Sequence, residues 1–104
     1  MKIVILGAGA VGSTLASLLS EENVIVVVDN CSSALSHLEE EADLKTILGG
    51  WSYPNILVNA DIANADMVVA VTGSDETNIV SCVIAKVLNG SVKTIARVRE
   101  ASYL

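Results

Sequence analysis

The sequence predicts an α/β fold, a doubly wound parallel β-sheet of five strands with helices on both faces. Two observations predict it: short apolar, β-branched runs alternate with amphipathic stretches, and glycine or other turn residues separate them. Alternation of strands and helices produces a parallel sheet, and right-handed crossovers place helices on both of its faces. The 104 residues, of which 52% are hydrophobic, suffice for one domain with its own core.

Each expected element follows from a local pattern. Strands are expected where apolar residues run together, at 2–6, 24–28, 44–48, 67–71 and 92–98. Helices are expected where apolar residues recur at helical spacing or follow a start signal, at 10–22, 32–42, 54–60 and 75–88. Pro54 suits the first turn of the third helix, and Asn89-Gly90 closes the fourth.

Charge and composition argue against nucleic acid as a partner. Six basic residues against twelve acidic ones give a net charge of −6, whereas binding to nucleic-acid phosphates needs a basic surface. The aromatic residues are few, namely Trp51, Tyr53 and Tyr103, and their pattern predicts no platform on which bases stack.

The sequence also predicts no membrane span, no secretory signal and no metal site. The apolar runs are too short to span a membrane, and the first residues enter a strand directly, without a secretory signal. Cys31 and Cys82 are therefore expected to be free thiols in a reducing compartment, with Cys82 in the core. His37 stands alone as a solvated helix residue, so no metal site is expected.

The strongest motif is the G-x-G-x-x-G of residues 7–12. It follows a predicted strand, opens a predicted helix, and is followed by Asp29 at the end of the next strand. Gly7 permits a tight turn, Gly9 lets the backbone approach a pyrophosphate, and Gly12 allows close contact between helix and strand. The amides at the start of the helix would then face the phosphates. The simpler alternative is a tight turn without a ligand.

The position of Asp29 after the second predicted strand indicates a preference between NAD and NADP. Its carboxylate can accept hydrogen bonds from the ribose diol of adenosine, and it would repel a 2′-phosphate. No Arg or Lys lies between residues 30 and 40 to offset that charge, so NAD is favoured over NADP. ATP and ADP carry the same free diol and stay open as ligands.

The fourth and fifth strands predict the other half of the site. Thr72 and Gly73 follow the fourth strand, which should neighbour the first strand at the point where the strand order reverses. Capping of the next helix by Ser74 is an alternative role for this turn, and the two roles can coexist. Arg97 and Arg99 share one face at the end of the fifth strand, where Arg97 could meet phosphate or carboxylate. A surface salt bridge is the alternative for Arg97.

Four segments together resemble a known family. They are residues 1–16 (MKIVILGAGAVGSTLA), Val28-Asp29-Asn30, residues 66–78 (DMVVAVTGSDETN) and residues 95–99 (IARVR). They are similar to the N-terminal nucleotide-binding domain of Trk-type potassium-uptake regulatory subunits, a regulator of potassium conductance (RCK) domain. All Rossmann proteins share the glycine motif, whereas the A-V-T-x-S-D-E-T-N pattern is much narrower.

The resemblance implies a non-enzymatic nucleotide sensor of Rossmann-like fold. Such domains are cytoplasmic, lie on the inner face of the membrane, assemble into dimers or rings, and regulate a membrane-embedded potassium transporter subunit. Their ligands are NAD(H) or ATP and ADP. The contacts implied here are Gly7, Ala8, Gly9, Ala10, Val11, Asp29, Gly50, Thr72, Gly73 and Arg97. Gly12 and Asn30 are also expected to belong to the cofactor-binding site. Family members continue into further elements, so residues 1–104 are expected to form one domain that is shorter than the full-length members.

Two other functions share the same glycine motif. The first is the cofactor-binding half of an NAD-dependent oxidoreductase, although the sequence offers no evident proton donor for hydride-transfer chemistry. The second is an assembly module with a vestigial site. The segment of residues 72–78 and the lack of a catalytic group favour the regulator.

Overall fold

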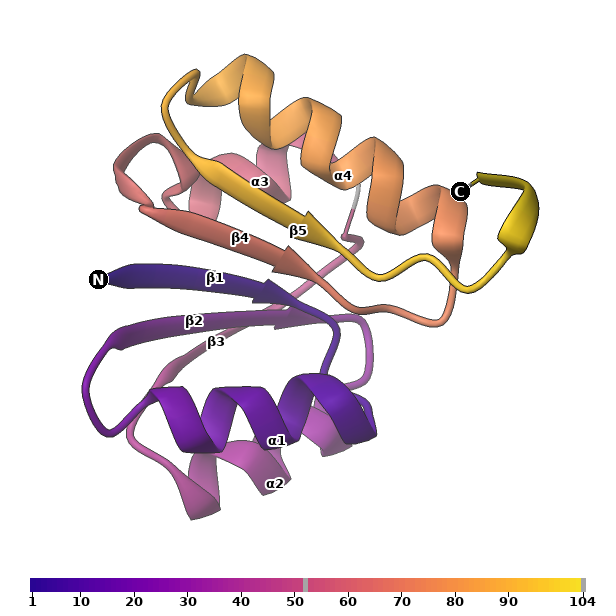
Figure 1. Cartoon of the computed structure of the whole chain (residues 1–104). Coiled ribbons are helices and arrows are strands. Elements are labelled where there is room, and N and C mark those ends of the chain that lie inside the picture. Colours follow the sequence, from indigo (N-terminus) through magenta and orange to yellow (C-terminus); the bar gives the residue numbers. More distant parts are fainter. Residues whose placement is uncertain (52, 104) are drawn as a thin grey trace.

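The computed structural model describes residues 1–51 and 53–103, and within them it has an all-parallel, five-stranded sheet (Figure 1). The strand order is β3-β2-β1-β4-β5, so the chain runs outward from β1 first in one direction and then in the other. The strands are β1 (Lys2–Leu6), β2 (Val24–Asp29), β3 (Lys45–Leu48), β4 (Met67–Ala70) and β5 (Lys93–Ala96). The predicted doubly wound sheet is thereby confirmed.

The helices cover both faces of the sheet, as Figure 1 shows, with α1 and α2 on one side and α3 and α4 on the other. Their bounds are α1 (Ala10–Leu19), α2 (Ser32–Glu41), α3 (Pro54–Asn59) and α4 (Asp75–Leu88), with short 3-10 turns η1 (Ile62–Asn64) and η2 (Ala101–Tyr103). The first helix is shorter than predicted, since the side-chain amide of Asn23 donates to the Leu19 carbonyl at 3.0 Å and satisfies the helix end.

The fifth strand also stops earlier than its apolar pattern predicts. It ends at Ala96, although the Arg97 amide still donates to the Ala70 carbonyl at 2.9 Å. The Arg97 carbonyl accepts instead from the side chain of Asn78, at 2.9 Å. The side chain of Asn78 in α4 thus provides the hydrogen bond that a neighbouring strand would otherwise give to this carbonyl.

The core consists of two apolar layers, one on each face of the sheet. Val4 and Leu6 of β1 pack with residues of α3 and α4, including Leu57. Ile3 and Ile5 face the other way, toward α1 and α2. Because successive strand residues point to opposite faces, the central strands must be apolar throughout, as the sequence has them.

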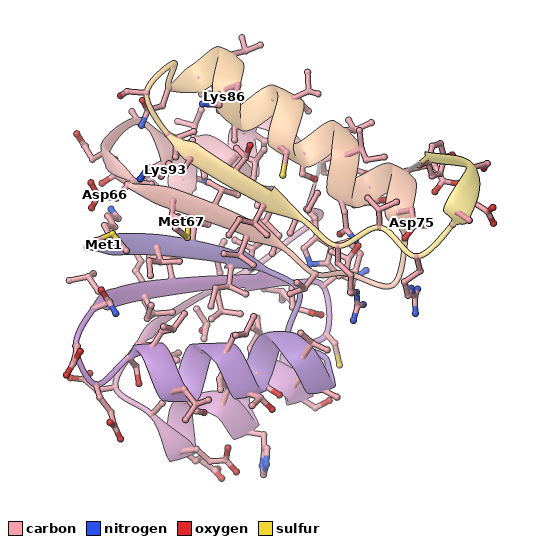
Figure 2. All side chains as sticks on the ribbon, viewed as in Figure 1. Met1, Asp66, Met67, Asp75, Lys86 and Lys93 are labelled. Atoms are coloured by element: carbon pink, nitrogen blue, oxygen red, sulfur yellow. The ribbon has the colours of Figure 1, made fainter. Side chains whose placement is uncertain are left out.

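The two ends of the sheet differ in what they carry. Met1, Asp66 and Lys93 lie at the end where the strands begin, whereas Asp75 lies at the end where they finish (Figure 2). At this second end β1 has β2 on one side and β4 on the other, so loops that leave in opposite directions open a crevice between them. Among the described helices, none is both long and apolar enough to cross a membrane.

Candidate functional site

The loop from β1 to α1 depends on its first and last glycines. Gly7 has a φ of 111°, which only glycine adopts without strain, and an added Cβ would come within 3.0 Å of the Val71 carbonyl oxygen. A Cβ on Gly12 would overlap the Gly7 carbonyl oxygen. By contrast, a Cβ on Gly9 would meet nothing within 4 Å. The loop therefore brings α1 against β1 while leaving open space above Gly9.

Asp29 fastens this loop to the end of β2. Its side chain is buried, at 7% exposure, and its Oδ2 accepts the backbone N–H of Ala8 at 2.6 Å. Its Oδ1 accepts the backbone N–H of Cys31 at 2.8 Å. Each carboxylate oxygen has two lone pairs, so Asp29 can still accept a further hydrogen bond on each. The carboxylate predicted to meet a ribose thus also shapes the glycine loop.

The turn after β4 is held by Asn78, which is fully buried in α4. The Oδ1 atom of Asn78 accepts from the backbone N–H and the hydroxyl of Thr72, at 2.9 and 2.7 Å. Its Nδ2 donates to the carbonyls of Thr72 and Arg97, at 3.2 and 2.9 Å. Ser74 caps α4 by accepting from the Thr77 amide at 3.2 Å. The capping role that was the alternative for this turn is confirmed.

Arg97 turns inward over the same turn. Its Nη2 donates to the carbonyls of Thr72 and Val71, at 2.7 and 3.2 Å, and its buried Nε has no partner among the described residues. The ion pairs in the described part of the chain join Lys2 to Asp61 and His37 to Glu41. The surface salt bridge considered for Arg97 is therefore not what this side chain makes.

A cavity of about 400 Å³ lies between the glycine loop, β2 and the turn after β4. Eight residues predicted for the site line it: Gly7, Gly9, Ala10, Val11, Asp29, Thr72, Gly73 and Arg97. Two residues that were not predicted line it as well, Trp51 and Val71. The structure thus brings most of the sequence-predicted residues to one hollow at the crevice.

Four residues expected as contacts do not line this cavity. Gly12 packs beneath the loop, and the amide of Ala8 is occupied by Asp29. Asn30 is exposed and lies just before the N-cap of α2. Gly50 lies against the ring of Tyr53, which a Cβ on Gly50 would approach to 3.0 Å. Gly12 thus makes the close helix–strand contact expected of it, and ligand contacts of Ala8, Asn30 and Gly50 stay predictions.

Trp51, the residue after Gly50, lines the cavity instead of Gly50. It follows β3 and is half-buried, and its indole Nε1 donates to the Val28 carbonyl at 3.0 Å. The Ser81 hydroxyl donates to the Trp51 carbonyl at 3.2 Å. The residue is the single tryptophan of the chain, which was the one signal in the sequence that could have pointed to it.

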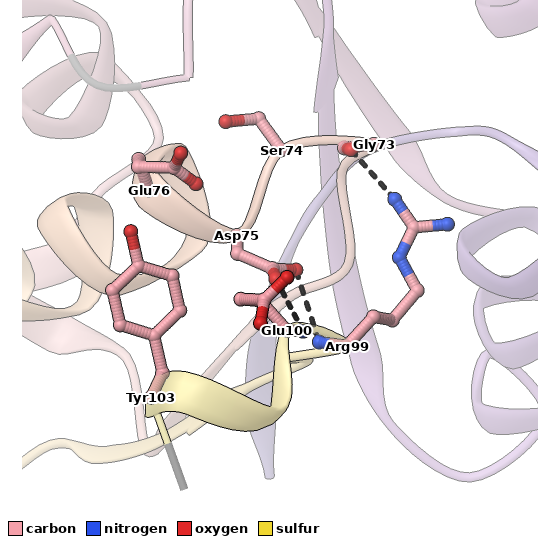
Figure 3. A pocket seen from close by; sticks show the side chains of 7 residues that line it. All are labelled: Gly73, Ser74, Asp75, Glu76, Arg99, Glu100 and Tyr103. Carbon is pink, nitrogen blue, oxygen red and sulfur yellow. Dashed lines mark hydrogen bonds between the residues drawn. The ribbon is translucent and has the colours of Figure 1, made fainter.

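A second hollow, of about 550 Å³, lies beside the first and shares Gly73 with it (Figure 3). The carboxylate of Asp75 accepts the backbone N–H groups of Arg99 and Glu100, at 3.1 and 2.8 Å. These bonds, that of Glu100 first, lower the pKa of Asp75. Arg99 donates through Nη2 to the Gly73 carbonyl at 2.7 Å. Arg97 and Arg99 thus reach the same turn, although both lie beyond the end of β5 and the strand alternation expected for them does not extend this far.

The remaining reactive side chains lie outside the cavity. Cys31 is an exposed free thiol whose pKa is lowered by its hydrogen bond to the Ser33 hydroxyl. Cys82 is a buried free thiol, as predicted, and burial raises its pKa. No group of His, Cys, Asp or Glu side chains suited to a metal ion occurs in residues 1–51 and 53–103.

Two curated relatives match this chain over its whole length. The chain is 50% identical over 105 residues to the Trk system potassium uptake protein TrkA of Haemophilus influenzae, and 48% identical to that of Halomonas elongata. Both matches cover 100% of this chain and 23% of the relative. The chain thus spans less than a quarter of the length of these relatives.

Solved structures and a family model agree with this likeness. The TrkA-N domain of the inner membrane protein ybaL from Escherichia coli has the same fold, with a TM-score of 0.88 at 20% identity over 97% of this chain and 75% of that chain. A GsuK channel bound to NAD matches with a TM-score of 0.84 at 28% identity, over 98% of this chain and 18% of that chain. The family model of the TrkA-N domain matches residues 3–104. The chain therefore belongs to the TrkA-N domain family.

Proposed function

We propose that this chain is a nucleotide-sensing regulatory domain that binds NAD or NADH and controls potassium uptake through a Trk-type membrane transporter. The observation that carries the proposal is the cavity in which the glycine loop, Asp29 and Arg97 meet at the end of the parallel strands. Ligands of doubly wound sheets bind at this crevice.

Each part of the cavity suits one part of a dinucleotide. The open space above Gly9, at the start of α1, suits the pyrophosphate, because the free amides and the positive end of the helix dipole favour an anion. Asp29 suits the adenosine ribose, and its charge disfavours the 2′-phosphate of NADP. Arg97 retains guanidinium donors on the far side, where a phosphate or the distal half of the ligand would lie.

Sensing requires that ligands differ in affinity between two conformations of the assembly. NAD, NADH, ATP and ADP share the adenosine and the diphosphate, which meet Asp29 and the glycine loop. The residues that would distinguish these ligands lie beyond them, at Thr72, Gly73 and Arg97. ATP and ADP are therefore proposed as competing ligands of the same cavity.

The proposed partner is a membrane-embedded potassium transporter subunit. Support comes from the names of the relatives, which are potassium uptake proteins, and from the 28%-identical channel structure bound to NAD. In such an assembly the domain would lie in the cytoplasm against the inner face of the membrane. It would associate with further copies as a dimer or a ring.

A chimera tests the regulatory role directly. This chain replaces the corresponding segment of the Haemophilus influenzae relative, and potassium uptake is measured with and without the change Gly9→Val. We expect the chimera to support uptake and the Gly9→Val chimera to lose its response to cellular nucleotide levels. An unchanged response in the variant would contradict the proposal.

A turnover assay separates this function from the oxidoreductase alternative. We expect the purified chain to bind NADH without consuming it in the presence of common carbonyl substrates. Catalytic loss of NADH absorbance, proportional to the concentration of the chain, would favour the enzyme instead.

A further inference from the structure

Trp51 lines the cavity, but the nucleotide-sensing function proposed for this chain assigns no contact to it. We propose that its indole ring forms the wall against which the nucleotide base stacks, so that the site selects purine nucleotides. The proposal rests on the nucleotide-binding function and adds the recognition of the base to it.

The position of Asp29 determines where the base must lie. If the ribose diol bonds to Asp29, the base is attached to the neighbouring carbon of the same ring and lies on the β2 side of the cavity. Trp51 follows β3, the strand that pairs with β2, and lines the same cavity. Val71, Thr72 and Arg97 come from the opposite side, after β4 and β5. Trp51 is thus the aromatic residue on the side where the base is expected.

The indole is held in place before any ligand arrives. Its Nε1 donates to the Val28 carbonyl at 3.0 Å, and its ring packs against the apolar layer beneath α3 and α4. The Ser81 hydroxyl fixes its backbone by donating to the Trp51 carbonyl. A side chain that is already ordered loses little conformational entropy on binding, which favours affinity.

The hydrogen bond from the indole Nε1 to the Val28 carbonyl also determines how Trp51 can recognise a base. The single N–H donor of indole is taken by Val28, so the ring can offer the base its face and no hydrogen bond. Stacking on an aromatic face depends on the area of the base and tolerates differences in its edge groups. We therefore expect preference for the large purine ring over the smaller nicotinamide ring at this position.

Trp51 is the single tryptophan of the chain, so a change in tryptophan fluorescence on ligand binding reports on this residue alone. AMP and nicotinamide mononucleotide are titrated separately into the chain, by calorimetry and by tryptophan fluorescence. The variants are Trp51→Leu, which removes the aromatic face, and Trp51→Phe, which keeps a face without the N–H group. Tyr53→Leu is the matched control, because Tyr53 is a nearby exposed aromatic residue outside the cavity. Circular dichroism and thermal unfolding establish that each variant is folded.

We expect AMP to change the Trp51 emission with the midpoint found by calorimetry. Trp51→Leu should lower the affinity for AMP by roughly five- to 100-fold, with a smaller loss for Trp51→Phe and none for Tyr53→Leu. The affinity for nicotinamide mononucleotide should change little. Equal or tighter AMP binding by folded Trp51→Leu and Trp51→Phe would overturn the inference while leaving the proposed function intact. Failure of the unaltered chain to bind AMP, NAD or NADH would overturn both.

Discussion

The structural role of Asp29 and the ribose recognition proposed for it depend on the same carboxylate. Since it accepts two backbone N–H groups, removal of the side chain by alanine would leave buried donors without partners and would destabilise the fold. The change Asp29→Asn removes the charge and keeps one of the two acceptor oxygens, so that only one of these two backbone N–H groups loses its partner. We expect it to weaken NAD binding by roughly 10- to 100-fold, because a charge-assisted hydrogen bond is lost.

The ratio of NAD to NADP affinity is the decisive readout for Asp29, because a general loss of stability would affect both ligands alike. We expect the preference for NAD to narrow in Asp29→Asn, since the amide no longer repels the 2′-phosphate. Calorimetric titration with both ligands measures the ratio. A ratio equal to that of the unaltered chain would show that Asp29 does not read the ribose.

Arg97 is the residue best placed to distinguish the candidate ligands. Its guanidinium lines the cavity and is already oriented by the carbonyls of Val71 and Thr72. We expect Arg97→Ala to change the relative affinities for NADH, ATP and ADP by roughly five- to 100-fold, since one charge-assisted contact differs among them. Binding of ADP-ribose should largely persist. Titrations with the four ligands test this, and a uniform loss, or no loss, would contradict it.

At the scale of elements, we expect changes at two glycines of the loop between β1 and α1 to act differently: a change at Gly9 affects nucleotide binding, and a change at Gly12 affects stability. We expect Gly9→Val to abolish nucleotide binding and to change the free energy of unfolding by less than about 1 kcal/mol. The added side chain enters open space at an extended backbone position, with φ −73° and ψ −163°, where a phosphate would lie. We expect Gly12→Ala to destabilise the fold by about 2 kcal/mol or more, because its Cβ would overlap the Gly7 carbonyl.

Denaturant unfolding and NAD titration on the same two variants check this pair. A stable Gly12→Ala variant would show that α1 does not need its close approach to β1. Unimpaired NAD binding by Gly9→Val would show that the loop holds no phosphate.

The elements were predictable from the sequence where their pattern is periodic. The apolar runs that became β1 and β2 are β-branched and uninterrupted, so both strands followed from local pattern. The end of β5 was not predictable, because there the buried side chain of Asn78 donates to the carbonyl of Arg97, which lies 19 positions later in the sequence. Trp51 was missed for the same reason: only the folded chain brings the loop after β3 beside Asp29.

At the scale of the whole molecule, Asp75 holds Arg99 and Glu100, which follow β5, against the start of α4 (Figure 3). Its pKa is lowered from the ordinary value of 3.8 by the backbone N–H groups that it accepts. The stabilisation is therefore present above the ordinary value and is lost as the pH falls through the lower, folded-state pKa.

We accordingly expect Asp75→Asn to melt at a lower temperature than the unaltered chain near neutral pH. The difference should shrink below pH 3.8, where the unfolded chain takes up the proton more readily than the folded chain does, until the pH falls through the lower pKa of the folded state. Glu76→Gln, which changes the adjacent side chain, is the control. Thermal unfolding over a range of pH values measures the effect, and a difference independent of pH would argue against the carboxylate as the fastening group.

The central claim is that the crevice between β1 and β4 binds NAD in preference to NADP. Calorimetric titration of the chain with each dinucleotide tests it most directly, with Gly9→Val measured beside it. The account predicts saturable binding of one NAD per chain, weaker binding of NADP, and no binding by a folded Gly9→Val variant. Absence of saturable NAD binding by the folded chain, or equal affinities for the two dinucleotides, would contradict it.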